Sequence, residues 1–289
     1  MPVLGPNQYG KAETRVVRVT RDGDVHHLKD LNVSVALSGD MDMVHYLGSN
    51  ASVLPTDTAK NTVYAFAKEH GIESAEQFGI HLARHFVTSQ RSIRRARIRI
   101  EEYAWQRLTP QHSFVRKGQE TRTAEVSYGD AGWQVVSGLK DLTVMNSTDS
   151  EFWGYVKDRY TTLSEATDRI LATDVNARWR FNWTAGDQPA PEWEQAYETV
   201  RGHLLDAFAG TYSLSLQQTL YAMGSRVVDN LPEIDEVRLS LPNKHHFLVD
   251  LSPFELKNDN EVYVAADRPY GLIEGTVLRD GVEARIPTD

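Results

Sequence analysis

The amino-acid sequence predicts an α+β protein in which helices cover one face of an antiparallel sheet. Three observations support this class. Strand and helix patterns come in blocks rather than in strict alternation, which favours antiparallel over parallel strands. The block order strand, strand, helix, helix, strand, strand occurs twice. Finally, 40% of the 289 residues are hydrophobic and 25% are charged, which is typical of a globular protein with a sizeable core.

The strands of the first half are recognised by alternation. Residues 14–21 are rich in β-branched side chains, and residues 25–38 alternate apolar and polar positions. Asp22-Gly23-Asp24 between them is typical of a hairpin turn. Residues 95–100 alternate three arginines with three aliphatic side chains, so one face of this strand should be basic and wet. A further hairpin is indicated by the turn residues within 128–133.

Two amphipathic helices are predicted between these strands. Apolar residues recur every three or four positions in residues 59–70 and again in residues 78–86. Gly71 follows the first stripe, where helices commonly end at a glycine. Ser74 and Gln77 form a capping box ahead of the second stripe.

The second half repeats this order of elements without an obvious repeat of residues. We therefore expect two domains, residues 1–137 and 138–289. The elements predicted in the second are strands around 142–144 and 175–183, helices over 193–208 and 216–227, and strands over 237–241 and 247–251.

Composition excludes several functional classes. The formal net charge of −9 argues against attraction to nucleic acid, and no recognition motif accompanies the arginine-rich segment 91–99. The absence of cysteine excludes disulfides, thiolate metal sites and cysteine nucleophiles. His81 and His85 have the i, i+4 spacing of two metal ligands, but such pairs are usually ordinary helix-surface neighbours, so no metal is expected.

No membrane association is expected either. No stretch approaches the roughly 20 apolar residues of a membrane-spanning helix. The first residues lack the apolar core of a secretory signal, and the last residues do not form a peroxisomal address. A cytoplasmic protein is the expectation.

Four segments carry side chains suited to chemistry, and each also has a structural interpretation. Lys11 in Tyr9-Gly10-Lys11 is either a solvated charge or, if partly desolvated, a base. The segment 55–62 resembles an ordinary helix N-terminus. The aromatic segment 150–155 is either core or a stacking platform for a flat heterocycle. His245, in a segment that should leave a strand, is either a turn residue or a proton carrier.

In this order the four segments resemble the signature regions of the urate oxidase (uricase) family. Residues 161–171 and 215–221 resemble it too, and the match runs from about Tyr9 to about Thr276. The resemblance implies two tunnelling-fold domains per chain, and a homotetramer whose sheets close into a barrel with active sites between subunits. It also implies oxidation of urate by O2 and water to 5-hydroxyisourate and hydrogen peroxide. No cofactor or metal is expected, because deprotonated urate supplies the electrons.

The resemblance assigns a substrate-binding role to four positions. Phe152 would stack on the purine, Arg169 and Gln217 would grip its polar edges, and the backbone amide of Leu216 would add a hydrogen bond. These roles suit the side chains. A guanidinium presents a rigid fork of donors, and a carboxamide offers both a donor and an acceptor.

It assigns the proton and oxygen chemistry to five further positions. Lys11, Thr56 and His245 would form a proton relay, in which the threonine hydroxyl passes a proton to the amine. Thr56 and Asn243 would hold oxygen or water above the ring. Thr56 and Asp57 would reach the substrate from the neighbouring subunit.

Two alternatives stay open at this point, because other families share this fold. One is pterin chemistry, although a pterin site in this fold typically anchors its ligand through a glutamate, where this chain has Gln217. The other is purine binding without catalysis, which would not require the set Lys11, Thr56 and His245.

Overall fold

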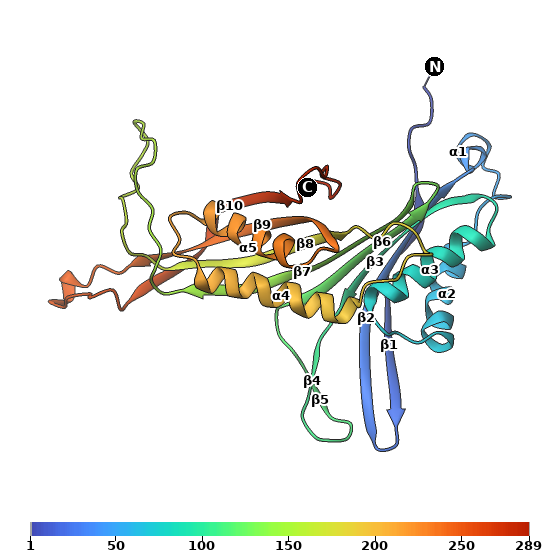
Figure 1. Cartoon of the computed structure of the whole chain (residues 1–289), viewed down its shortest axis with the longest axis horizontal. Helices are drawn as coiled ribbons and strands as arrows, with labels where there is room; N and C mark the ends of the chain where they lie inside the picture. The colour runs from blue at the N-terminus through green and yellow to red at the C-terminus, as the bar shows by residue number, and fades with distance from the viewer. Residues whose placement is uncertain (1, 289) are drawn as a thin grey trace. The chain divides into compact units, whose positions relative to one another are not determined.

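The computed structural model describes residues 2–288, which form two compact units of α+β class (Figure 1). Unit 1 comprises the residues up to 138 together with 180–197. Unit 2 comprises 139–179 and the residues from 198 onward. Two strands, β7 (Gly132–Asn146) and β8 (Leu171–Phe181), have residues in both units.

The strands of unit 1 follow the order β1-β2-β3-β6-β7. The alternation predicted for residues 95–100 is confirmed, because Ala96, Ile98 and Ile100 are buried whereas the arginines between them are not. The first pairs, β1 with β2, β2 with β3 and β3 with β6, are antiparallel. The bounds are β1 (Tyr9–Asp22), β2 (Val25–Gly39), β3 (Ile93–Glu102) and β6 (Thr121–Gly129).

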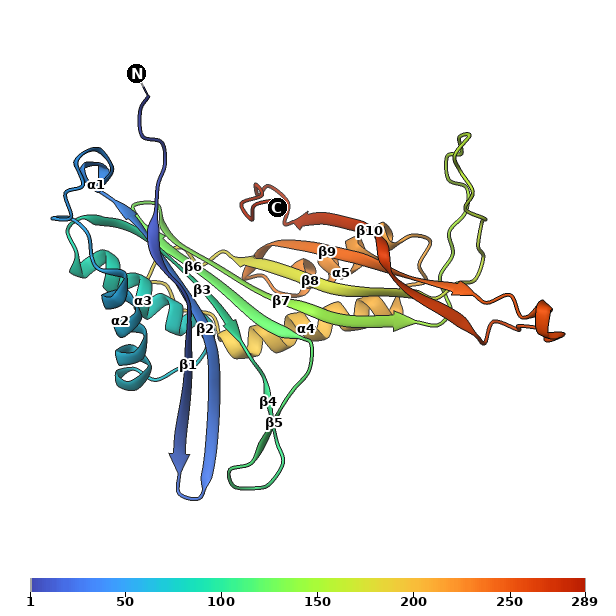
Figure 2. The ribbon, with the colours of Figure 1, turned by 180° about the vertical axis from the view of Figure 1, so that it is seen from behind.

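Helices α2 (Thr56–Glu69) and α3 (Ala75–Ser89) pack on these strands, α2 against β1 and α3 against β3 and β6 (Figures 1 and 2). The predicted cap at Ser74 is confirmed, since its hydroxyl accepts a hydrogen bond from Gln77 N at 3.0 Å. The Gln77 side chain does not complete the box but donates to His81, with an Nε2–Nε2 distance of 2.7 Å. Three short elements were not predicted: α1 (Asp42–Leu47), β4 (Trp105–Arg107) and β5 (Phe114–Arg116).

Unit 2 contains the strand order β7-β8-β9-β10, helix α5 and the part of helix α4 from residue 198 onward. Helix α5 packs on β9 and β10. Gly224 permits this approach, because a Cβ there would lie 2.5 Å from Val277 Cγ2. The bounds are α4 (Trp193–Gly210), α5 (Leu216–Asn230), β9 (Ile234–Leu248), β10 (Tyr263–Leu278) and a 3-10 turn (Ser252–Phe254).

The two strands predicted over 237–241 and 247–251 are wrong as separate elements. Residues 237–241 and the first two residues of 247–251 belong to β9, which continues through Pro242, whereas residues 249–251 lie outside the strands. The last strand is β10. Proline costs only one backbone donor and its φ suits an extended chain, so the register carries on with Pro242 opposite Leu272. The Pro242 carbonyl is also used, accepting a hydrogen bond from Thr173 Oγ1 at 2.9 Å.

A buried charged network ties α3 to β6 and β7 in unit 1. Glu76 is fully buried, and Arg122 Nη2 donates to its carboxylate at 2.7 Å. Ser137 Oγ donates to the other carboxylate oxygen at 2.5 Å. Arg122 also pairs with Glu194 at 2.8 Å and lies over the ring of Tyr197. Charges removed from water are tolerated only where partners such as these compensate for the lost hydration.

Three histidines meet where α2 ends beside α3. The His70 and His81 ring centroids are 5.2 Å apart, and His85 packs edge-on against Phe66 at 4.8 Å. Burial lowers the pKa of His81 and His85, and His70 lowers both further by its charge. Among residues 2–288, no group of three or more His, Asp or Glu side chains is arranged to hold a metal ion.

We expect this cluster to make the fold less stable in mild acid. A histidine whose pKa is lowered in the folded state stays neutral at a pH where the same histidine in the unfolded chain, with a pKa of about 6.5, binds a proton. The unfolded chain is therefore favoured, and stability falls, as the pH drops through that value. The melting temperature should therefore fall between pH 7.5 and pH 5.5, and His85→Phe should reduce that fall. His112→Phe, at an exposed position, is the matched control and should leave it unchanged. An equal fall in all three proteins would contradict the prediction.

Within the described residues, no helix combines the length and apolarity needed to cross a membrane.

Candidate active site

Phe152 and Arg169 lie together on the long excursion between β7 and β8 (yellow-green in Figure 1). Phe152 exchanges two backbone hydrogen bonds with Ala166, at 2.7 and 3.0 Å. These bonds bring Arg169 back toward the platform, and its Cζ lies 5.2 Å from the Phe152 ring centroid. The Tyr155 ring is stacked on Phe152 at 4.9 Å. The result is a half-buried aromatic plate with a cation beside it.

The Arg169 side chain is partly withdrawn from water. Burial lowers its pKa from the usual value, although a guanidinium remains charged. Its Nε donates to Ser150 Oγ at 3.1 Å, and its backbone N donates to Ser150 O at 2.9 Å. A partly desolvated, oriented cation of this kind suits an anionic or strongly polar planar ligand.

The N-terminus of α5 is fastened to the same excursion. Glu151 N donates to Ser213 O at 2.7 Å, and Ser213 N donates to Asp149 O at 2.9 Å. Ser215 then caps α5, accepting from Gln218 N at 3.2 Å. Leu216 and Gln217 follow as the first two residues of the helix.

Leu216 and Gln217 therefore stand in the first turn of α5. The first amides of a helix have no partner within the helix and favour negative charge, so the Leu216 N–H is available to a ligand. The Leu216 side chain is buried, which fixes that amide, whereas Gln217 is exposed.

Asn243 and His245 occupy alternate positions of β9 and therefore share one face of it. The antiparallel course of β8 and β9 shows which residues they approach. Thr173 bonds to Pro242 O and Asn176 to Ser240 O, so numbers rise along β8 as they fall along β9. The start of β8, two residues after Arg169, thus lies beside the part of β9 that follows Pro242.

Lys11, Thr56 and Asp57 come together in unit 1. Thr56 and Asp57 open α2, which packs on β1, the strand that carries Lys11. The pKa of Asp57 is lowered chiefly by the hydrogen bond from Lys60 at 2.5 Å, and the charge of Lys11 contributes to the same shift. Helix α2 thus begins with Thr56 and Asp57 and packs on the strand that carries Lys11.

Two local features position Lys11. A β-bulge follows it, with the register shifting between Lys11 and Thr14 and Glu13 at φ 55°; bulges re-aim side chains in this way. Tyr9 OH accepts a hydrogen bond from Leu54 N at 3.0 Å, which joins the strand two residues before Lys11 to the loop that leads into Thr56. Sequence reasoning gave Tyr9 no role, because nothing in a lone tyrosine indicates which distant amide it binds.

The predicted site residues divide between the units. Lys11, Thr56 and Asp57 lie in unit 1. All the others lie in unit 2, namely Phe152, Arg169, Leu216, Gln217, Asn243 and His245.

The uricase family model matches residues 7–127 and 135–274, and every predicted site residue falls inside these ranges. The chain belongs to the uricase family.

Relatives of this family match the chain over nearly its whole length. It is 51% identical over 286 residues to the uricase of Arthrobacter globiformis, covering 99% of this chain and 93% of that protein. It is 36% identical to the uricase of Danio rerio, covering 94% and 93%. Among solved structures, the A. globiformis uricase matches with a TM-score of 0.95 at 50% identity, covering 99% and 98%. The uricase of Bacillus fastidious matches with a TM-score of 0.78 at 25% identity, covering 96% and 94%.

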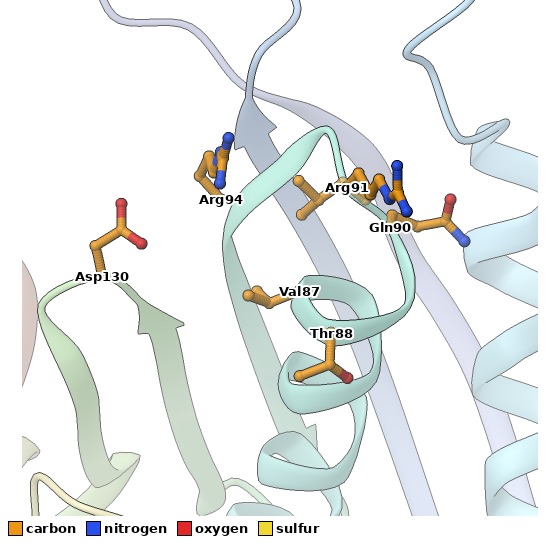
Figure 3. A pocket seen from close by; sticks show the side chains of 7 residues that line it. Val87, Thr88, Gln90, Arg91, Arg94 and Asp130 are labelled. Carbon is orange, nitrogen blue, oxygen red and sulfur yellow. The ribbon is translucent and has the colours of Figure 1, made fainter.

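One surface pocket of this uricase-family chain is not lined by the predicted site residues. Its volume is about 350 Å³, and it lies between the end of α3, the start of β3 and Asp130 (Figure 3). Arg94 at its edge is already held by Asp40, with Nε and Nη2 at 2.9 and 2.8 Å from one carboxylate oxygen. None of the seven lining residues is a predicted site residue.

We expect Gly10→Ala to damage both the fold and the activity of this uricase. A Cβ at Gly10 would lie 1.8 Å from Val35 O, so β1 must move away from β2 next to Lys11. The expected cost is about 1–3 kcal/mol of stability, with a fall in turnover of about tenfold if Lys11 moves with the strand. Melting temperature and initial rate measure the two effects. Gly5→Ala is the matched control, since a Cβ there would meet nothing within 4 Å; equal behaviour of the two variants would contradict the prediction.

Proposed function

We propose that the chain is a urate oxidase that converts urate, O2 and water to 5-hydroxyisourate and hydrogen peroxide without a cofactor. Membership of the uricase family supports the activity. One observation supports the location of the active site. Short backbone hydrogen bonds hold Phe152, Arg169 and the N-terminus of α5 together.

This arrangement suits recognition of a flat anion. The purine stacks on Phe152, and Arg169 donates two parallel hydrogen bonds to acceptors on one edge. The Leu216 amide and the Gln217 carboxamide serve another edge, where the helix N-terminus adds favourable electrostatics for negative charge. Stacking fixes the ring in a plane and removes one face from water, so the remaining face is where O2 reacts.

The reaction needs proton transfer as well as binding. Urate loses two electrons and O2 gains them, taking two protons to become hydrogen peroxide, and water adds the hydroxyl to the ring. Lys11, Thr56 and His245 move these protons, and Asn243 with Thr56 holds O2 or water over the ring. General acid–base groups of this kind typically contribute about 10²–10⁴-fold to the rate.

We further propose that the two groups of residues meet between subunits of a homotetramer in which the sheets close into a barrel. Lys11, Thr56 and Asp57 of one subunit would then face the purine held by unit 2 of its neighbour. Exposed apolar side chains support association, because contiguous apolar surface usually marks an interface. Those on β9 and β10 are Phe247, Leu248, Val264, Tyr270, Leu272 and Leu278.

A direct assay tests the activity. Purified protein in aerobic buffer with a metal chelator should consume urate, seen as loss of its ultraviolet absorbance, and form one hydrogen peroxide per urate. Omission of O2 should stop the reaction. Binding of urate without its consumption would leave a purine-binding protein and overturn the proposal.

A further inference from the structure

Ser150 occupies a position that sequence reasoning left without a role. Its side chain is almost fully buried, with 1% of the residue exposed. Its hydroxyl accepts from Arg169 Nε at 3.1 Å and its carbonyl accepts from Arg169 N at 2.9 Å. The Ser150 hydroxyl thus holds one edge of this guanidinium, whose Cζ lies 5.2 Å from the Phe152 ring centroid.

We propose that Ser150 is a positioning residue that aims the Arg169 guanidinium at the purine. A guanidinium has five N–H donors in one plane. Because the Nε–H is held by the buried hydroxyl, the plane of the fork is fixed while both Nη groups remain for the ligand. An arginine without this tie would have to be ordered each time a ligand binds, which weakens binding. This role rests on the proposed function.

The same serine links Arg169 to the second purine contact. Ser150 forms a backbone bridge to Ser213, whose hydroxyl donates to Ser215 O at 3.1 Å and accepts from Thr219 Oγ1 at 2.8 Å. Ser213 and Thr219 are fully buried. Ser215 caps α5 directly before Leu216 and Gln217, so the two sides of the purine site share one rigid attachment.

A double-mutant cycle tests the proposal. Ser150→Ala should raise the KM for urate, and the Kd of an unreactive xanthine analogue, about tenfold, the usual loss for one hydrogen bond to a charged group. The kcat should change about twofold or less, because Ser150 acts on binding rather than on proton transfer. Arg169→Lys removes the Nε donor while keeping the charge. In that background Ser150→Ala should leave the Kd of the analogue unchanged.

Ser213→Ala is the matched control, because this buried serine lies in the same bridge but its hydroxyl bonds to Ser215 O and Thr219 Oγ1 instead of to Arg169. Its effect on the Kd should be the same with Arg169 and with Lys at that position. If Ser150→Ala does not fold, Ser150→Cys, which keeps the volume with a weak acceptor, takes its place in the cycle. No effect of the Ser150 change, or an equal effect in both backgrounds, would overturn the proposal. If the wild-type chain oxidises urate, either of these outcomes overturns only the role of Ser150 and leaves the proposed function intact. If the wild-type chain does not oxidise urate, the proposed function itself is wrong.

Discussion

Lys11→Met should lower the kcat for urate oxidation by about 10²–10⁴-fold, the range for loss of a general acid–base group. The KM for urate should change about threefold or less, because the groups proposed to hold the purine, Phe152, Arg169 and Gln217, lie in the other unit. Methionine keeps most of the length of the side chain and removes the amine. Steady-state rates with urate, together with the Kd of an unreactive xanthine analogue, separate the two effects.

Lys68→Met is the matched control, since Lys68 is an exposed lysine near the other end of α2. It should retain wild-type turnover. If Lys11→Met turns over urate as fast as Lys68→Met, the proton relay is wrong. If both kcat and analogue binding collapse together, Lys11 holds the ligand rather than moving protons.

Arg122→Met should destabilise the fold by about 3–5 kcal/mol, because it leaves the fully buried Glu76 carboxylate without its cation. In a protein of this size the melting temperature should fall by about 10 °C. The double variant Glu76→Gln/Arg122→Met should recover part of the loss, since no buried charge remains. Melting temperatures are compared at one protein concentration, because association would shift them.

The loss of stability in Arg122→Met should also grow as the pH rises, because of the protonation of Glu76. Burial raises the pKa of Glu76, and Arg122 opposes that rise. Without Arg122, the Glu76 carboxyl group keeps its proton in the folded chain, whereas in the unfolded chain it releases that proton above about pH 4.3. Stability therefore declines as the pH rises from the pKa of the unfolded chain toward the higher pKa of the folded chain. The deficit of Arg122→Met should therefore be smaller at pH 5 than at pH 7.5. A deficit below about 1 kcal/mol at pH 7.5 would show that the pair does not support the fold.

Local patterns predicted much of the fold because they depend on near neighbours. The alternation in β3 and the cap at Ser74 were correct, since each follows from side chains within a few positions. The break expected between residues 241 and 247 was wrong, because β9 continues through Pro242 and loses only one backbone donor there.

Contacts between distant residues could not be read in the same way. Glu76 lies 46 positions from Arg122, and both would be expected on a solvated surface from their type alone. The hydrogen bonds between Arg169 and Ser150 and between Leu54 and Tyr9 likewise depend on the tertiary fold, which brings distant parts of the chain together. The residues proposed to carry the chemistry were identified through six segments that resemble a known family, whereas the residues that hold them in place left no such pattern.

Mixing two inactive chains tests the shared active site most directly. Thr56→Ala removes a group of unit 1 and Arg169→Ala removes a group of unit 2. If each site takes unit 1 from one subunit and unit 2 from its neighbour, a mixed pair has one site with both changes and one intact site. Co-assembly from equal amounts should then restore about one quarter of the wild-type sites, because about half of the pairs are mixed and the interface is reciprocal. Complete inactivity of verified mixed assemblies would show that each subunit builds its site alone.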